Sequence, residues 1–213
     1  MDNEILRITS ADIDAEGRYI GSADLRNFIG SIEFAENLCT VRIAGSISAS
    51  LAIIAGAGTG IEAGKGIKAG WGIKAGDGIE AGWGIEAGWG IKAGDGIKAG
   101  DGIKAGCGIK AGWGIKAGKG IEAGCGIKAG WGIKAGDGIE AGWGIEAGDG
   151  IEAGDGIKAG LSITAKFVNS RLRIFAGLCM WRIPKQDESQ IRAELRSGTV
   201  AFGTLIQPAV GEK

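Results

Sequence analysis

The chain has 213 residues, 44 of them glycine and none of them histidine, and its formal net charge is -1. The near-neutral balance gives no general attraction to nucleic acid or to an acidic membrane surface, and the missing histidine removes the most frequent catalytic base. No apolar stretch is long enough to cross a membrane, and the acidic start Met1-Asp2-Asn3-Glu4 is unlike a signal peptide, so we expect a cytoplasmic protein.

Residues 1–60 predict degenerate coils and a cap at the amino end of a larger repeat structure. Val41, Ile47 and Ile53 recur with a step of six residues, and an insertion of two residues around Thr59 precedes the regular tract that follows. Terminal repeats are expected to be irregular, because a bare coil edge would recruit other chains. Irregular strands are expected at 6–9, 13–15, 28–34 and 38–41.

Residues 61–160 repeat one hexad, Ile-(Lys/Glu)-Ala-Gly-X-Gly, which occurs sixteen times without error from Ile61 to Gly156. This period fits neither an α-helix nor collagen. In a short strand, Ile and Ala face a core and the charged residue faces water. Glycine at the fourth and sixth positions indicates a bend that needs positive φ or close backbone approach. The fifth position holds Trp, Asp, Lys or Cys, and because a buried unpaired charge is costly, it is an outward corner.

The number of hexads per coil follows from the residues that would stack. A coil of twelve residues would stack different residue types at every corner, but the charged residues stacked on a face would nearly alternate between Lys and Glu. A coil of eighteen residues would make one corner wholly apolar and would stack four lysines in a single row. Like charges at strand spacing repel, yet surface charges are screened and weak. We therefore favour three-sided coils of about 18 residues.

Residues 161–213 predict a last coil and an irregular cap. Ile163-Thr-Ala continues the repeat, and mixed and polar residues fill 171–190. The segment 191–196 fits either a short helix or a strand, and 199–206 predicts a strand paired back over the last coil. Together the three parts predict one continuous all-β domain, a single-stranded parallel β-helix (β-solenoid) that is three-sided.

The apolar corner is the strongest candidate for a functional surface, because a row of large apolar side chains in water marks an interaction site. Aromatic stacking that only stiffens the edge is the plainer alternative. The predicted binding edge consists of Trp71, Trp89, Cys107, Cys125 and Trp143. Secondary binding residues are Trp83, Trp113, Trp131, Lys74, Lys92, Lys110 and Lys128.

The four cysteines show no CxxC spacing, which predicts reduced thiols. In three-sided coils Cys107 and Cys125 are neighbours at about 5 Å by strand spacing, so a disulfide between them is an open alternative.

Other chemical signals are weaker than their plain explanations. Glycine-rich phosphate loops need a strand, loop and helix, which a solenoid does not supply, and one aspartate per hexad is a poor calcium site. The lysine row beside tryptophans resembles a nucleic-acid track, but the balancing acids favour a solvated face. We therefore predict no catalytic residue, no cofactor, no metal, and neither nucleic acid nor membrane as a partner.

The hexad resembles two known groups of repeat proteins. Left-handed hexapeptide acyltransferases share the period, but they use a catalytic histidine and a different spacing from the one in which Ile61 precedes Ala63 by two positions. Gly45-Ser46-Ile47-Ser48-Ala49 and the run from Gly60 to Gly160 are similar to the motifs of bactofilins, polymer-forming bacterial cytoskeletal proteins. This resemblance implies a right-handed three-sided helix that self-associates. The tract equally resembles uncharacterised Ile-x-Ala repeat proteins of bacteria and phages.

The sequence thus predicts a structural or interaction protein without enzymatic activity, which self-associates and presents a tryptophan-rich edge to other proteins. The alternative is a phage or mobile-element protein that inhibits a host defence or host enzyme by direct contact. The expected partner is accordingly a second copy or a host protein. An ice-binding face is least favoured, because the outward strand positions hold Lys or Glu where such faces hold Thr.

Overall fold

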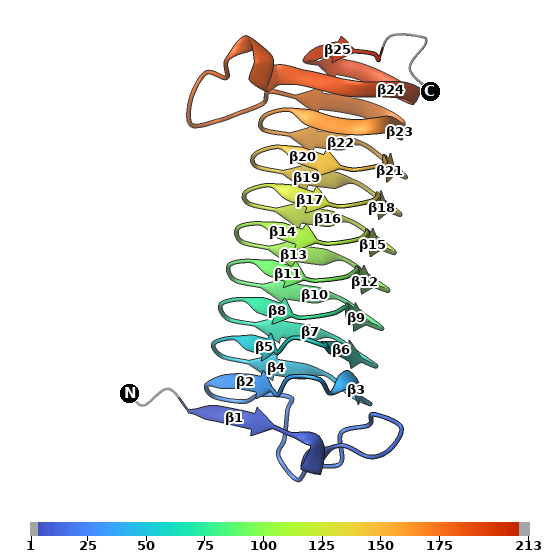
Figure 1. The fold of residues 1–213 in the computed structure, drawn as a ribbon. Coiled ribbons are helices and arrows are strands. Elements are labelled where there is room, and N and C mark those ends of the chain that lie inside the picture. Colours follow the sequence, from blue (N-terminus) through green and yellow to red (C-terminus); the bar gives the residue numbers. More distant parts are fainter. Residues whose placement is uncertain (1–3, 209–213) are drawn as a thin grey trace.

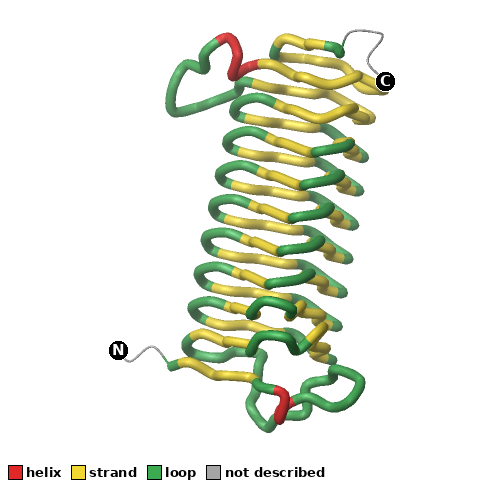
Figure 2. Tube along the Cα trace, in the orientation of Figure 1, coloured by secondary structure: helices red, strands yellow, loops and turns green. Residues whose placement is uncertain are grey.

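The structure is a computed structural model that describes residues 4–208, and it is a parallel β-solenoid of about 10 turns. Figure 1 shows the coils stacked into a tower, with the amino-terminal segment at one end and the carboxyl-terminal strands at the other. In Figure 2 short strands alternate with turns around each coil, and the helical turns lie at the two ends of the tower. The sequence prediction of an all-β solenoid is confirmed.

In the part of the chain that the structure describes, twenty-five strands form one continuous sheet. The strands are β1 (Ile5–Ile8), β2 (Ser31–Phe34), β3 (Cys39–Ile43), β4 (Ile47–Ala49), β5 (Ile53–Ala55), β6 (Thr59–Ala63), β7 (Ile67–Ala69), β8 (Ile73–Ala75), β9 (Ile79–Ala81), β10 (Ile85–Ala87), β11 (Ile91–Ala93), β12 (Ile97–Ala99), β13 (Ile103–Ala105), β14 (Ile109–Ala111), β15 (Ile115–Ala117), β16 (Ile121–Ala123), β17 (Ile127–Ala129), β18 (Ile133–Ala135), β19 (Ile139–Ala141), β20 (Ile145–Ala147), β21 (Gly150–Ala153), β22 (Ile157–Ala159), β23 (Ile163–Ala176), β24 (Gln190–Phe202) and β25 (Thr204–Ile206). Two 3-10 helices, η1 (Ser10–Asp12) and η2 (Gln186–Ser189), lie in the terminal regions.

Each hexad strand pairs in parallel with the strand one coil further along the chain, so that Ile67 lies beside Ile85 and Lys68 beside Glu86. The coil therefore has about 18 residues, as predicted. Three strands per coil create three faces. The first face contains β4, β7, β10, β13, β16, β19 and β22; the second contains β5, β8, β11, β14, β17 and β20; the third contains β3, β6, β9, β12, β15, β18 and β21.

The core consists of the Ile and Ala side chains of every hexad, because alternation along each strand turns both inward. Ile67 is 1% and Ala69 is 2% exposed, and the other inward Ile and Ala residues of the hexads are likewise buried. Burying one isoleucine side chain contributes roughly 1.5–3 kcal/mol, and the hexad adds one such residue at every strand. The repeat thus builds a continuous hydrophobic core without any other apolar residue type.

The two glycines of a hexad differ in their surroundings. A Cβ on Gly112, at the fourth position, would lie 1.7 Å from the carbonyl oxygen of Gly94 in the preceding coil. A Cβ on Gly114, at the sixth position, would lie 3.3 Å from the oxygen of Gly132. The described glycines with positive φ all lie outside the regular hexads. Close backbone approach, and not positive φ, is therefore the reason for the fourth glycine.

The two-residue insertion before the regular tract widens one coil. Val41 pairs with Ile61 and Ile53 with Ile73, a spacing of 20 residues. Thr59 is fully buried at this point, and its Oγ1 accepts a hydrogen bond from the Leu38 amide and donates one to the Ala35 carbonyl. These bonds satisfy backbone groups that the widened corner would otherwise leave unpaired.

The terminal regions depart from the predicted strands in specific places. Residues 13–15 form no strand, because η1 redirects the chain and Ile13 makes only a single antiparallel bridge to Tyr19. Residues 191–196 are part of a strand, consistent with their alternating burial. The segment 199–206 is divided at Gly203 (φ 103°): residues 199–202 end β24 and pair in parallel with 173–175 of β23, as expected, whereas β25 adds a further parallel rung on β24.

Candidate interaction surface

The predicted binding edge forms one corner of the tower, between the first and second faces, and is called the apolar edge here. The backbone stacks its residues directly: the Trp89 amide donates to the Trp71 carbonyl at 2.7 Å, and each following member donates to the one before. The Cys107, Cys125 and Trp143 donor–acceptor distances are 2.6, 2.8 and 3.1 Å. The structure thus brings all five predicted residues into a single row.

The indoles of the apolar edge are open to solvent: Trp71 is 58%, Trp89 is 72% and Trp143 is 51% exposed. A leucine continues the row at each end, because the Trp71 amide donates to the Leu51 carbonyl and the Leu161 amide to that of Trp143. The surface is therefore longer than the five predicted residues.

The loop at 177–189 extends this edge, which sequence reasoning missed. The Trp181 ring lies against that of Trp143, with centroids 6.4 Å apart and planes inclined by 44°. Met180 and Ile183 beside it are 94% and 93% exposed. Three large apolar residues within four positions of a nonperiodic segment were the available signal. In Figure 1 this loop projects from the corner of the tower near its carboxyl-terminal end.

The cysteines are free thiols in the structure, so the alternative of a Cys107–Cys125 disulfide is not formed. A hydrogen bond with the Cys107 thiol, together with partial burial, raises the pKa of the Cys125 thiol to about 11. Cys125 is therefore a poor nucleophile at neutral pH, since the thiolate is the reactive form.

The secondary tryptophans occupy the other two corners. Trp113 and Trp131 stack at the corner between the second and third faces, with ring centroids 6.2 Å apart and planes 19° apart. Trp83 lies at the remaining corner, where the Lys65 ammonium sits 5.4 Å from its ring centroid. The structure thus brings Trp113 and Trp131 together and places Trp83 apart from them.

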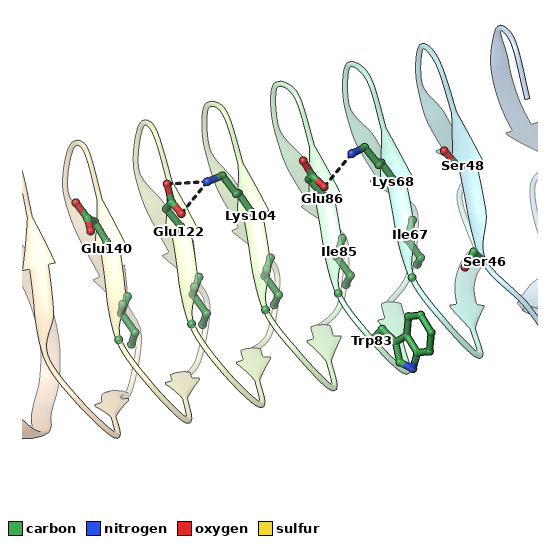
Figure 3. Close-up of a pocket in the computed structure, with 18 of the residues that line it drawn as sticks. Ser46, Ser48, Ile67, Lys68, Trp83, Ile85, Glu86, Lys104, Glu122 and Glu140 are labelled. Carbon is green, nitrogen blue, oxygen red and sulfur yellow. Dashed lines mark hydrogen bonds and ion pairs between the residues drawn. The ribbon is translucent and has the colours of Figure 1, made fainter. Parts of the chain in front are cut away.

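Charges are paired along the first and third faces. On the first face, Lys68 binds Glu86 at 3.1 Å and Lys104 binds Glu122 at 3.0 Å, and Figure 3 shows these contacts along the groove of this face. A further pair there joins Lys158 to Glu140. The third face holds the pairs Arg42–Glu62, Lys98–Glu80 and Lys134–Glu152. These exposed pairs contribute little stability individually, but among the described residues they pair the hexad charges of the first face and all except Lys116 on the third.

The second face carries the predicted lysine row. Lys92 lies between Lys74 and Lys110 in register, and Lys128 follows Lys110. Only Lys128 has an ion pair among the described residues, with Glu146 at 2.6 Å. The eighteen-residue coil therefore stacks lysines on successive rungs, as the sequence predicts for a coil of this length.

The carboxyl-terminal loop is held by a bidentate ion pair. The Arg182 guanidinium donates to both carboxylate oxygens of Glu188, at 2.6 and 2.7 Å. This contact, together with the Lys185 amide, lowers the pKa of the Glu188 carboxyl to about 2. The Glu188 carboxyl is therefore ionised at neutral pH, and the ion pair joins the loop to η2.

The chemistry of these surfaces is repetitive. Within residues 4–208, no three His, Cys, Asp or Glu side chains converge as metal ligands would, and no helix there is long and apolar enough to cross a membrane. Open grooves follow the faces, with volumes of about 1060 Å³ on the first and 670 Å³ on the second. The same few groups line each groove along its length, which suits extended contact more than reaction at one point.

No family model, curated protein or solved structure matches this chain.

Proposed function

We propose that the chain is an interaction protein without enzymatic activity, whose apolar edge is its contact surface and whose first partner is a second copy of itself. The observation that carries the proposal is the continuous apolar row from Leu51 to Leu161, joined by Trp181. Such rows on a soluble surface mark contact sites, and tryptophan is the residue most enriched at binding hot spots. Self-association also agrees with the resemblance to bactofilins.

The exposed area on this edge is enough for a modest interface. An indole has about 150–250 Å² to bury, and the four tryptophans of the edge and loop are each more than half exposed. Together they offer roughly 400–500 Å² per copy, about half of the surface that a standard interface buries on each side. Met180, Ile183 and the two leucines increase this area.

The four inner residues of the edge are ordered symmetrically, and the next pair outward, Trp71 and Leu161, is apolar on both sides. Cys107 and Cys125 are the central pair, and the next residues outward are Trp89 on one side and Trp143 on the other. A two-fold axis between the cysteines and perpendicular to the tower would place Cys107 against Cys125 of the partner subunit and Trp89 against Trp143 of the partner subunit. Closed two-fold dimers use self-complementary patches of this kind.

The first test is the mass in solution, measured by light scattering over a wide range of protein concentration. Mass that rises with concentration is expected for the native chain. Replacing Trp71, Trp89 and Trp143 by serine should leave a monomer. The control variant has three tryptophans at the other corners replaced by serine, and it should associate like the native chain. The control residues are Trp83, Trp113 and Trp131. Equal association of both variants would refute the apolar edge as the contact surface.

The second test addresses the two-fold arrangement by thiol cross-linking. In a background with Cys39 and Cys179 replaced by serine, we would prepare Cys107→Ser and Cys125→Ser proteins. The antiparallel dimer predicts a covalent dimer on mild oxidation only when the two proteins are mixed, because Cys107 then meets Cys125 of the partner subunit. Cross-linking of either protein alone would show a parallel arrangement instead.

A second candidate function is contact with a different protein, and the loop at 177–189 favours it. Met180 and Ile183 project where no repeat requires them, which suits recognition of a foreign surface, including inhibition of a host enzyme or defence protein. A chain that remains monomeric at every concentration would support this function over self-association. Four free thiols are typical of a reducing compartment, so we place either function in the cytoplasm.

A further inference from the structure

Among residues 4–208, the second face is the only one of the three whose lysines lack acidic partners along most of their row. Lys74, Lys92 and Lys110 form no ion pair within residues 4–208, and they lie on successive rungs. Rungs are 4.7–4.9 Å apart, so the four lysines from Lys74 to Lys128 span about 14 Å. Their stems line a groove of about 670 Å³ that runs along the tower. This surface is a cationic track.

The third face provides the contrast that defines the track. It also stacks three lysines, Lys98, Lys116 and Lys134, but the two outer ones bind Glu80 and Glu152. Lys116 alone has no acidic partner there among the described residues. Three consecutive unpaired cations therefore occur on the second face and on neither of the others. The overall charge of -1 hides this difference because it averages all faces.

A second copy of the chain cannot supply the complementary charges in register. Only another solenoid repeats its side chains at the same rung spacing, and the hexad tract contains no stack of three successive acidic residues. Its longest acidic stacks hold two, such as Glu62 with Glu80 and Asp77 with Asp95. The track therefore fits a polyanion from outside the chain.

Aromatic side chains border the track on both sides. Trp71 and Trp89 lie on the apolar edge, beside the rungs of Lys74 and Lys92. Trp113 and Trp131 lie at the opposite corner, beside the rungs of Lys110 and Lys128. Unpaired bases stack on exposed indoles, and sequence-tolerant binding of single strands combines such stacking with a cationic groove. An acidic peptide would use the lysines but would have no comparable use for the indoles.

We propose that the second face binds single-stranded nucleic acid, with phosphates along the lysine row and bases against the bordering tryptophans. Asp77 and Asp95 occupy the corner beside Lys74 and Lys92. The bases of the nucleic acid strand therefore contact the apolar edge at the rungs of Lys74 and Lys92. At the following rungs they contact Trp113 and Trp131. This proposal differs from the expectation drawn from the sequence that the chain does not bind nucleic acid. That expectation rested on acidic residues balancing the lysines, and in the structure the acids that pair with lysines lie mainly on the other two faces.

Binding is tested by fluorescence anisotropy of a short labelled oligothymidylate with the full chain, over a series of salt concentrations. Three or four phosphate contacts predict a slope of log K against log salt of about -2 to -3. The decisive pair of variants is Lys110→Glu and Lys116→Glu. Both lysines are unpaired, occupy the same hexad position and have lysines on both neighbouring rungs.

Lys110→Glu should weaken binding about tenfold and flatten the salt slope, whereas Lys116→Glu should leave both nearly unchanged. Trp131→Ser should weaken binding about fivefold or more through lost stacking, with Trp83→Ser as the control at a distant corner. Neither lysine lies on the apolar edge, so these variants test the cationic track even where the mass measurements reject self-association. Circular dichroism of each variant verifies folding.

Three results would overturn the inference. The first is the absence of salt-dependent binding by the native chain at low salt. The second is an equal loss in Lys110→Glu and Lys116→Glu, which would show attraction to the molecule as a whole. The third is binding of an oligoglutamate peptide as tight as that of oligothymidylate, with no effect of Trp131→Ser, which would make the ligand an acidic protein segment.

Discussion

Replacing the fourth-position glycine of one hexad by alanine should damage the solenoid far more than replacing the sixth. In Gly112→Ala the new Cβ would lie 1.7 Å from the Gly94 carbonyl oxygen, so the two coils must separate by more than an ångström. Steric overpacking costs about 1–3 kcal/mol, and weakening the bond from the Gly112 amide to the Ala93 carbonyl adds about 1 kcal/mol. We expect a loss of about 3 kcal/mol or more in the free energy of unfolding.

In the matched variant Gly114→Ala, the Cβ meets the Gly132 oxygen at 3.3 Å, which small shifts relieve. Lower conformational entropy of the unfolded chain offsets this by about 0.4–1 kcal/mol, so the net change should stay within about 1 kcal/mol. Urea unfolding followed by circular dichroism measures both, and Gly112→Ala should lower the midpoint by about 1 M or more. Equal midpoints for the two variants would show that close approach is not what the fourth glycine provides.

Three further outcomes follow from single side chains. Alkylation of Cys125 should be slow at neutral pH and rise with a midpoint near pH 11, and Cys107→Ser should shift that midpoint downward because the thiol hydrogen bond changes. The Glu188 carboxyl should titrate by NMR near pH 2 and, in Arg182→Gln, move toward 4.5. Since its folded pKa is lowered, its stabilising contribution is complete above pH 4.5 and is lost as the pH falls toward 2. Thr59→Val should cost about 1 kcal/mol in urea unfolding, because two part-buried backbone groups lose the partner that the buried hydroxyl provides; an unchanged midpoint would show that water replaces the hydroxyl.

The regular tract could be predicted closely from the sequence because each residue type has one physical role there. Alternation fixes Ile and Ala inward, and the composition of one corner distinguishes eighteen from twelve residues per coil. The charge pattern pointed to the wrong coil, since screened surface pairs are weak and the buried core decides the geometry. Lys74 and Lys92 therefore stack despite their repulsion.

The terminal regions were less predictable because tertiary contacts decide them. The alternation at 13–15 gave no strand, since the chain is turned by η1 and by Asp14, whose carboxylate accepts bonds from the amides of Glu16 and Arg18. Nothing in the local pattern of 177–189 indicates that Trp181 lies against Trp143, a contact that depends on where the last coil ends. Ion pairing was likewise visible only once the register placed each lysine beside its neighbour on the next coil.

The two proposed surfaces are adjacent, and this adjacency predicts coupling between them. A two-fold axis between Cys107 and Cys125 places the second faces of both copies on the same side of the dimer, with Lys110 toward Lys128 of the partner subunit. Like charges then oppose dimerisation at low salt, and a bound polyanion removes the opposition. By linkage, oligothymidylate should strengthen dimerisation, and dimerisation should strengthen oligothymidylate binding by the same factor. Sedimentation velocity with and without the oligonucleotide measures this factor. If the oligonucleotide instead weakens dimerisation, the second copy of the chain and the oligonucleotide compete for Trp71 and Trp89.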